Sequence, residues 1–145
     1  MADDSSKIEM IVQQYVEHIK HQMQSRSYRV ANEMRNESQK VLRGQRSGRR
    51  YRVPNTKAYY TASAPGEPPA VRTGTFRRSW QAKSYADGDN VHSVIESNAT
   101  TENGKYLLGE MLEEGTSKMA PRPYKQRILE KARQQAMRIY KEPYF

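Results

Sequence analysis

Three glutamates, Glu110, Glu113 and Glu114, have the residue type and spacing that acid–base catalysis or Mg²⁺ binding would need. At positions i, i+3 and i+4 they share one face of a helix, so their carboxylates could converge. They also lie near the predicted C-terminus of that helix, where the helix dipole disfavours negative charge and the carboxylates repel one another. We therefore interpret them as an acidic surface, either solvated or facing a cationic partner, rather than as a catalytic centre.

Other residues that could do chemistry are few. His18 and His21 lie three residues apart beside Glu17, a spacing that can hold a metal, but the pattern includes no further convergent ligand. The chain contains no cysteine, which excludes disulfides, thiolate zinc sites and cysteine nucleophiles. The sequence has neither a nucleophile elbow nor a glycine-rich phosphate loop. It predicts a protein that is not an enzyme and carries no metal or cofactor.

Positive charge is concentrated in one segment. The chain has a net charge of +9, and six basic residues with no acidic residue lie between Arg43 and Lys57, so the other 19 of its 25 basic residues are nearly balanced by 16 acidic ones. Such a cluster is a candidate contact for phosphate or for an acidic protein surface, and a solvated loop is the alternative. Nearby tyrosines could stack on bases, which makes four arginines candidate DNA contacts of low sequence specificity: Arg46, Arg49, Arg50 and Arg52.

A long helix is expected before this segment. Ser6 and Glu9 form a capping-box pattern, and apolar residues then recur at helical spacing as far as Val41. Gly44 is the expected stop, and the helix is either continuous or interrupted near Ser25–Tyr28. At 1.5 Å per residue it would span roughly 50 Å, which is longer than a domain of this size can cover. We expect part of it to pack on other subunits.

Shorter elements follow. In chain order we expect a loop or irregular hairpin at Gln45–Lys57, an extended stretch at Ala58–Ser63, an irregular turn at Ala64–Ala70 and a short helix from Thr73 to Trp80. A hairpin of Gln81–Ala86 and Val91–Ser97 follows, then a helix or ordered turn at Tyr106–Glu114 capped by Gly115, and a final helix with Pro123 in its first turn. This order makes the fold α+β: a long N-terminal helix, a small antiparallel sheet with a β-hairpin, and a C-terminal helix packed on the sheet. We divide the single domain 1–145 into the long helix 1–43, a basic loop 44–63 and an α+β core 64–145.

The composition favours a protein that assembles with others. Only 35% of the residues are hydrophobic, so the core should be modest and some apolar surface should be buried between subunits. Tyrosine dominates the aromatic residues, with ten copies, and it suits half-buried and interface positions because its ring packs while its hydroxyl keeps a polar partner. The sequence has no apolar run long enough for a membrane helix, so we expect a soluble chain without membrane contact.

Two blocks of the sequence each consist of a rigid turn that leads into a short amphipathic segment. The first, Gly66–Trp80, contains Pro68-Pro69, then Thr73-Gly74, then Phe76-Arg77-Arg78-Ser79; the second, Glu113–Tyr124, contains Glu113-Glu114-Gly115-Thr116-Ser117-Lys118 and then Arg122-Pro123-Tyr124. Together they resemble the two motifs of the tail-completion proteins, or head–tail joining (neck) proteins, of long-tailed bacteriophages. Phe76 replaces the usual aliphatic residue, and Glu114 stands where an apolar or aromatic residue is common.

The resemblance implies a non-enzymatic virion protein, made in the host cytoplasm and built into the neck. Such subunits form a connector ring, usually hexameric, between the head-completion (stopper) ring and the tail tube or its terminator, and DNA passes through it. The alternatives are a minor capsid or tail-terminator protein of related fold, or a non-specific nucleic-acid-binding protein.

A ring needs two different patches of one subunit to meet, so we expect the acids between Glu110 and Glu114 to approach basic residues of the next subunit. Those basic residues lie either between Arg43 and Lys57 or at Arg77 and Arg78. The expected interface residues are Arg77, Arg78, Trp80, Glu110, Glu113, Glu114, Thr116, Lys118 and Arg122.

Overall fold

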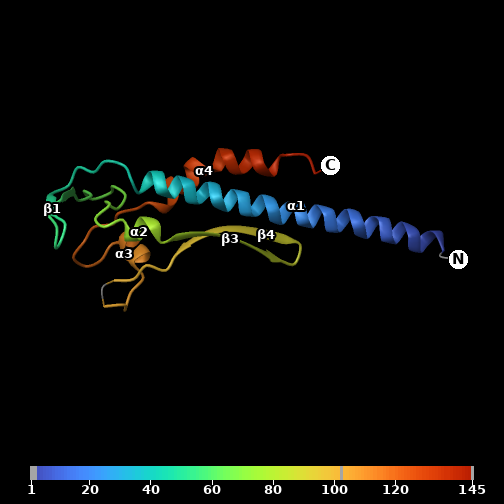
Figure 1. Ribbon diagram of the computed structural model, residues 1–145, viewed down its shortest axis with the longest axis horizontal. Coiled ribbons are helices and arrows are strands. Elements are labelled where there is room, and N and C mark those ends of the chain that lie inside the picture. The colour runs from blue at the N-terminus through green and yellow to red at the C-terminus, as the bar shows by residue number, and fades with distance from the viewer. Residues whose placement is uncertain (1–2, 102, 145) are drawn as a thin grey trace.

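The computed structural model describes residues 3–101 and 103–144, arranged along one long helix, α1 (Asp4–Val41). In Figure 1 the C-terminal helix α4 (Lys125–Tyr140) lies along one side of α1, and the hairpin of β3 (Trp80–Asp87) and β4 (Asn90–Ser97) lies along the other. Four short elements gather beyond the C-terminal end of α1: β1 (Arg50–Arg52), β2 (Tyr59–Thr61), α2 (Thr75–Arg78) and α3 (Leu108–Glu114). At its other end, α1 extends past both neighbours.

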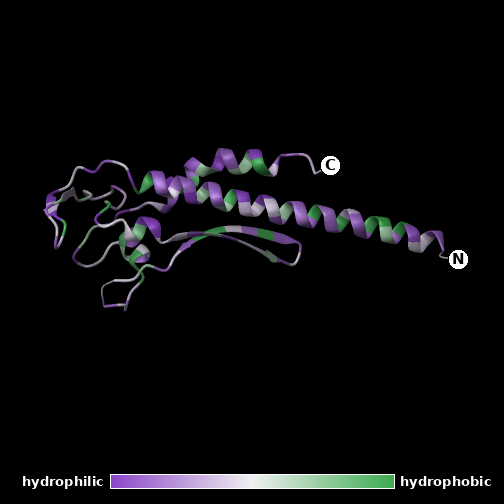
Figure 2. Ribbon diagram, in the orientation of Figure 1, coloured by the Kyte–Doolittle hydropathy of each residue, from purple (hydrophilic) through white to green (hydrophobic). Residues whose placement is uncertain are grey.

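Helix α1 begins earlier than its capping-box pattern predicts and runs without interruption. Asp3 is the N-cap, and the Ser6 hydroxyl donates to the Asp3 carbonyl oxygen at 2.9 Å instead of capping the helix itself. The helix continues through Ser25–Tyr28 and ends at Val41, before Gly44. Its 38 residues make a rod about 57 Å long. Hydrophobic residues recur along that whole length (Figure 2).

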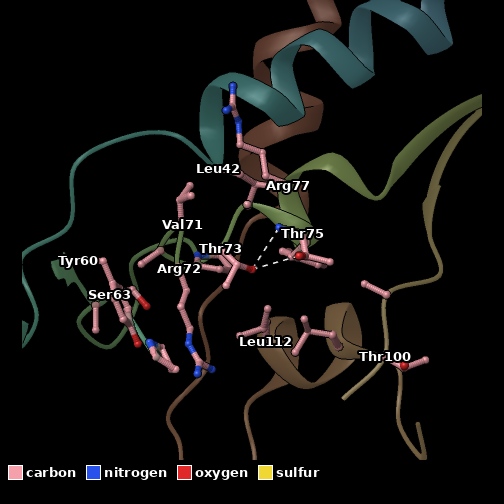
Figure 3. Close-up of a pocket in the computed structure, with 18 of the residues that line it drawn as sticks. Leu42, Tyr60, Ser63, Val71, Arg72, Thr73, Thr75, Arg77, Thr100 and Leu112 are labelled. Carbon is pink, nitrogen blue, oxygen red and sulfur yellow. Dashed lines mark hydrogen bonds between the residues drawn. The ribbon is translucent and has the colours of Figure 1, made fainter. Parts of the chain in front are cut away.

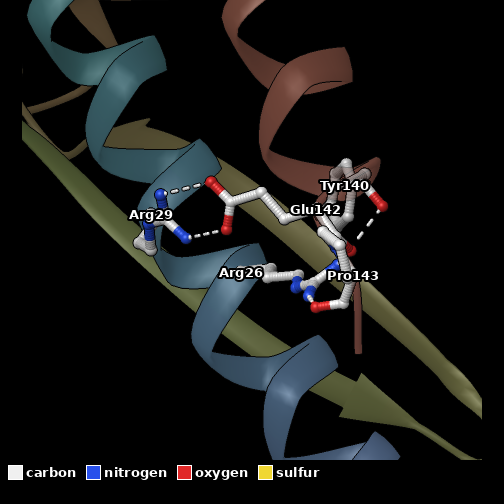
Figure 4. Close-up of polar contacts among 5 residues, drawn as sticks. All are labelled: Arg26, Arg29, Tyr140, Glu142 and Pro143. Atoms are coloured by element: carbon white, nitrogen blue, oxygen red, sulfur yellow. Dashed lines mark hydrogen bonds and ion pairs between the residues drawn. The ribbon is translucent and has the colours of Figure 1, made fainter. Parts of the chain in front are cut away.

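Two arginines hold the end of the chain against the middle of α1, at the point where the apolar stripe is interrupted. Arg26 is buried and donates to the main-chain carbonyl oxygens of Glu142 and Pro143 (Figure 4). Arg29 pairs with both carboxylate oxygens of Glu142, at 2.7 and 2.8 Å. This hydrogen-bonded pair raises the pKa of Arg29 and lowers the pKa of the Glu142 carboxyl. These contacts join the end of the chain to α1 where the local sequence alone left a break open.

The antiparallel strands form two separate hairpins. β3 and β4 pair from Trp80 opposite Ser97 to Asp87 opposite Asn90. Gly88, with φ of +60°, takes the first position of their two-residue turn, as type II′ geometry requires. β1 pairs with β2, so the basic segment is an irregular hairpin.

The boundaries of α2, α3 and α4 differ from the sequence expectations, and α3 begins at Leu108 rather than at Tyr106. α2 starts after Gly74, which has φ of +84°, and it ends at Arg78 because Trp80 already belongs to β3. Thr73 therefore precedes the N-cap, and its hydroxyl oxygen accepts from the Thr75 amide at 3.4 Å. The N-cap of α4 is Tyr124, so the preceding proline lies outside the helix rather than in its first turn.

The core lies where α1 ends. Its buried members are Val41, Leu42, Trp80, Tyr124 and Ile128, with Phe76, Ile95 and Leu112 packed around them. Helix α4 reaches the β3–β4 hairpin at both of its ends, because the Tyr124 ring packs on Trp80 and the Tyr140 hydroxyl lies 2.8 Å from the Ser93 hydroxyl. The α+β fold with a C-terminal helix packed on the sheet is therefore confirmed.

Candidate interaction surfaces

The two sequence blocks meet in the core. Phe76 and Trp80 from the first block and Tyr124 from the second make mutual edge-to-face contacts, with ring centroids 5.6 or 5.7 Å apart. The Trp80 side chain is 6% exposed and Tyr124 is 1% exposed. The aromatic positions of both blocks therefore hold the subunit together. Trp80, which we expected at an interface, is part of the core of the single chain.

The second block builds a turn that caps α4. Gly115 has φ of +79°, and a Cβ atom there would lie 2.8 Å from the Met119 carbonyl oxygen. Past this turn, the Glu113 carboxylate accepts hydrogen bonds from the main-chain amides of Tyr124 at 2.8 Å and Lys125 at 3.2 Å. Amides at a helix N-terminus have no partner within the helix, and a negative charge suits that end of its dipole. The Glu113 carboxylate, expected to contact another subunit, is thus engaged within its own chain.

The Tyr124 hydroxyl ties α3 to the start of α4. It donates to the Gly109 carbonyl oxygen at 3.0 Å, and a Cβ atom on Gly109 would come within 2.7 Å of it. Burial raises the pKa of Tyr124 well above its ordinary value, and the charges of Glu113 and Glu110 raise it further. The hydroxyl therefore remains a protonated hydrogen-bond donor at neutral pH.

The other expected interface residues fall into an internal group and an exposed group. Arg77 donates from Nε to the Gln39 carbonyl oxygen at 3.0 Å, and its own carbonyl oxygen accepts from the Gln39 side chain at 2.7 Å. Arg122 donates to the Ser63 hydroxyl at 2.9 Å. These two arginines fasten the blocks to the rest of the chain. The members that remain exposed are Arg78, Glu110, Glu114, Thr116 and Lys118.

Arg46 differs from the other candidate DNA contacts because its side chain is half-buried. Its guanidinium donates to the carbonyl oxygens of Val41 at 2.7 Å, Pro68 at 2.6 Å and Pro69 at 3.1 Å. Burial lowers the pKa of Arg46. The side chain thereby joins the end of α1 to the proline turn of the first block, and it is not available to a partner.

A carboxylate completes this attachment. Glu67, in the same turn, accepts hydrogen bonds from the Ser47 hydroxyl, from the Ser47 amide at 3.0 Å and from the Ala64 amide at 2.9 Å. The Ser47 hydroxyl contributes most to lowering the pKa of Glu67 to about 2, followed by the two amides. The negative charge of Glu67 therefore holds the basic segment against the first block.

The exposed basic residues cluster on the β1–β2 hairpin, and we call Arg49, Arg50, Arg52 and Lys57 the cationic hairpin. Side chains of a strand alternate between its two faces, so Arg50 and Arg52 share one face of β1. Tyr59 pairs with Arg52 on that face, and the Arg50 guanidinium lies 4.7 Å from the centroid of its ring. The structure thus keeps three of the four candidate arginines exposed.

A pocket of about 950 Å³ lies beside the cationic hairpin (Figure 3). Tyr60 of β2 forms one wall, the segment with Val71 and Arg72 crosses it, and Leu112 of α3 lines the opposite side. The described residues that line it include no acid and no histidine. This lining suits an apolar surface with negative charge at its edge, and it offers no general acid or base.

At the far end of the molecule, α1 presents a surface that contacts between subunits could use. Every residue from Asp3 to His18 is exposed, and we call this segment the projecting arm. Its apolar residues Ile8, Ile11, Val12 and Val16 are between 42% and 61% exposed and share one helix face. The arm ends where His18 Nε2 lies 2.9 Å from the Tyr144 carbonyl oxygen. The apolar spacing indicated such contacts from sequence, but nothing in it distinguished this end from the packed part of α1.

No helix in residues 3–101 and 103–144 is long and apolar enough to cross a membrane. Across the same residues, no group of three acidic, histidine or cysteine side chains is placed to hold a metal. No family model, curated protein or solved structure matches the chain.

Proposed function

We propose that this chain is a structural subunit of a bacteriophage neck, where it forms a ring that joins the tail to the head and surrounds the passing DNA. One observation carries the proposal beyond the resemblance of the two blocks to tail-completion proteins. Phe76, Trp80 and Tyr124 bring both blocks into a single aromatic cluster. The family motifs belong to one fold, and this shared cluster is the contact that such a fold requires of them.

The exposed parts of the blocks supply a surface for neighbours. Arg72 and Thr73 of the first block and Thr116, Ser117 and Lys118 of the second are all exposed. Both blocks lie at the end of the molecule that carries the cationic hairpin, away from the projecting arm (Figure 1). Their buried residues form the core, and their exposed polar residues can contact the stopper ring, the tail tube or an adjacent subunit.

Two acidic residues on α3 and in the second block are available for this contact with neighbouring proteins. Glu110 and Glu114 are exposed, while Glu113 is occupied at the start of α4. A pair of reversals at Glu110 and Glu114 should therefore weaken docking without disturbing the fold. The control is Glu130→Lys, a single reversal at an exposed residue of α4 whose carboxylate accepts a hydrogen bond from the Gln126 side chain at 3.2 Å.

Non-specific nucleic-acid binding is the second candidate function, favoured by the cationic hairpin. Arg50 and Arg52 lie on one face with Tyr59, so phosphate contact and base stacking could occur side by side. In a ring this face would line the channel and meet DNA without reading its sequence. As an isolated protein, it would bind DNA in a strongly salt-dependent manner.

Light scattering coupled to size exclusion distinguishes the neck function from non-specific nucleic-acid binding. The purified chain is run alone, with purified phage tails, and with DNA-filled heads, and each run is repeated with the Glu110→Lys/Glu114→Lys variant and with Glu130→Lys. Attachment to one particle, lost in the double variant and kept in the control, supports the neck assignment. A chain that ignores both particles but binds free DNA is a nucleic-acid-binding protein, and one that binds none of them refutes both functions.

A further inference from the structure

The two ends of the molecule carry opposite charge. The projecting arm has four acidic residues, Asp3, Asp4, Glu9 and Glu17, against one basic residue, a net charge of −3 in a chain whose total is +9. The cationic hairpin at the other end has four exposed basic residues and lies in a stretch without a single acid. Opposite charge of this kind steers surfaces together and fixes their register.

The arm also carries an exposed apolar stripe of about two and a half helical turns, from Ile8 to Val16. Ile8, Ile11, Val12 and Val16 follow the spacing i, i+3, i+4 and i+8, which is the pattern of a helix that lies in a groove. The same stripe continues through Ile19 and Met23 into the part of α1 that packs on its neighbours. The exposed stripe of the arm therefore continues the helix face that packs on neighbouring elements further along α1. It provides an apolar face and negative charge for one more contact.

We propose that the projecting arm of one copy docks on a second copy of this chain, in the pocket beside the cationic hairpin. The apolar stripe lies against the pocket side chains, which include Tyr60, Val71 and Leu112. The acids beside the stripe, Asp4 and Glu9, meet Arg49 and Arg72, which are exposed at the edge of the pocket, since Arg49 is on the same strand face as Tyr51, the partner of Tyr60, and Arg72 lines the pocket. The lining brings no acid that would repel the arm.

The contact has to form between copies. Helix α1 is continuous from the arm to the core, and its length of about 57 Å keeps the two surfaces at opposite ends of one molecule (Figure 1). An arm-to-pocket contact joins two different patches, so each copy presents its apolar stripe and its pocket to neighbouring copies. A repeated contact of this kind closes into a ring when its rotation divides a full turn. This inference rests on the proposed ring and identifies the surfaces that build it.

The test reverses the charges of the arm and of its proposed docking site, singly and together, in the purified chain. Sedimentation velocity measures association over a concentration series at about 50 mM and about 500 mM NaCl. Asp4→Lys/Glu9→Lys changes the arm, and Arg49→Glu/Arg72→Glu changes the edge of the pocket. Each pair of reversals should weaken association at least about tenfold, and a chain that carries both should recover it, because the charges again oppose one another.

Two further variants control the experiment. Ile11→Gln/Val12→Gln removes part of the apolar stripe and should also weaken association. Glutamine is a good helix former, so the helix itself should be preserved. Glu130→Lys makes the same charge change as each arm reversal on α4 and should leave association unchanged. Circular dichroism and the fluorescence of Trp80, the only tryptophan of the chain, verify that each variant is folded.

A wild-type chain that stays monomeric at low salt overturns this inference. So does association that ignores the reversals, or that the combined variant fails to recover. Loss of DNA binding on Arg49→Glu/Arg72→Glu, with association unchanged, would assign these arginines to DNA instead. No phage particle enters this test, so attachment to heads or tails can succeed while self-association fails, and the two results remain distinguishable.

Discussion

Replacing Glu113 by alanine should destabilise the folded chain without touching its hydrophobic core. The carboxylate accepts the amides of Tyr124 and Lys125 at the start of α4. Loss of a helix cap costs roughly 1 kcal/mol, and an amide left buried without a partner costs a further 1–3 kcal/mol, as a rough range. Tyr124 is 1% exposed, so water has poor access to its amide, whereas Lys125 is exposed and can be solvated. We expect Glu113→Ala to lower the free energy of unfolding by about 2–3 kcal/mol.

Two further substitutions, at Glu113 itself and at its neighbour, serve as controls for this prediction. Glu113→Gln keeps an oxygen acceptor but removes the charge, so it should cost only about 1 kcal/mol. Glu114→Ala removes an exposed carboxylate of the same helix and should stay within about 0.5 kcal/mol of wild type. Urea unfolding can be followed by the fluorescence of Trp80, whose buried ring contacts Tyr124. A melting temperature lower by about 6–9 °C should accompany Glu113→Ala. Equal stability of Glu113→Ala and Glu114→Ala would refute the capping role.

Further predictions concern the residues around these blocks. Tyr124→Phe should cost about 1 kcal/mol, because it removes the hydrogen bond to α3. The pKa of Tyr124 is higher in the folded chain than in the unfolded chain, so wild-type stability should be fully present below pH 10 and fall above it, and urea titrations should show a smaller fall for Tyr124→Phe. The pKa of Glu67 is lowered from 4.5 to about 2, so its contribution should be present above pH 4.5 and lost as the pH falls toward 2, and Glu67→Gln should flatten that acid limb in urea midpoints. Gly115→Ala should cost more than about 2 kcal/mol in thermal unfolding, because its positive φ and its approach to the Met119 carbonyl oxygen act together, whereas Gly104→Ala, with φ of +71° and open space around it, should cost only about 1 kcal/mol.

The sequence predicted the elements well where a local signal decides them. The periodicity of α1, the turn at Gly88 and the glycine stop at Gly115 are properties of neighbouring residues, and the structure confirms all three. The continuity of α1 past Ser25–Tyr28 could not be predicted from neighbouring residues. There Arg26 contacts carbonyl oxygens more than 110 residues away, at Glu142 and Pro143, and the neighbouring residues of the sequence carry no sign of these contacts.

The candidate site residues show the same division. Arg46 and Arg49 have the same residue type in the same basic segment, yet the first is held by three carbonyl oxygens and the second is exposed. Glu113 and Glu114 are adjacent, and only the first caps α4. Side-chain type identified these groups as polar surface, while tertiary geometry decided which members the chain uses itself. The acidic composition of the projecting arm, by contrast, was readable from sequence and was obscured by the excess of basic residues elsewhere.

Because helix α1 is uninterrupted, the number of residues between the projecting arm and the core determines the direction in which the apolar stripe of the arm faces. Each residue added between the arm and the core would turn the apolar stripe by about 100° and move it outward by about 1.5 Å. One inserted residue would therefore aim the stripe away from any neighbour that the wild-type chain faces. Seven inserted residues would bring it back to within about 20° of its original direction, roughly 10 Å further out. Reach and direction are thus coupled through the helical repeat, and lengthening of α1 in steps other than about seven residues would change the direction of the contact along with its distance.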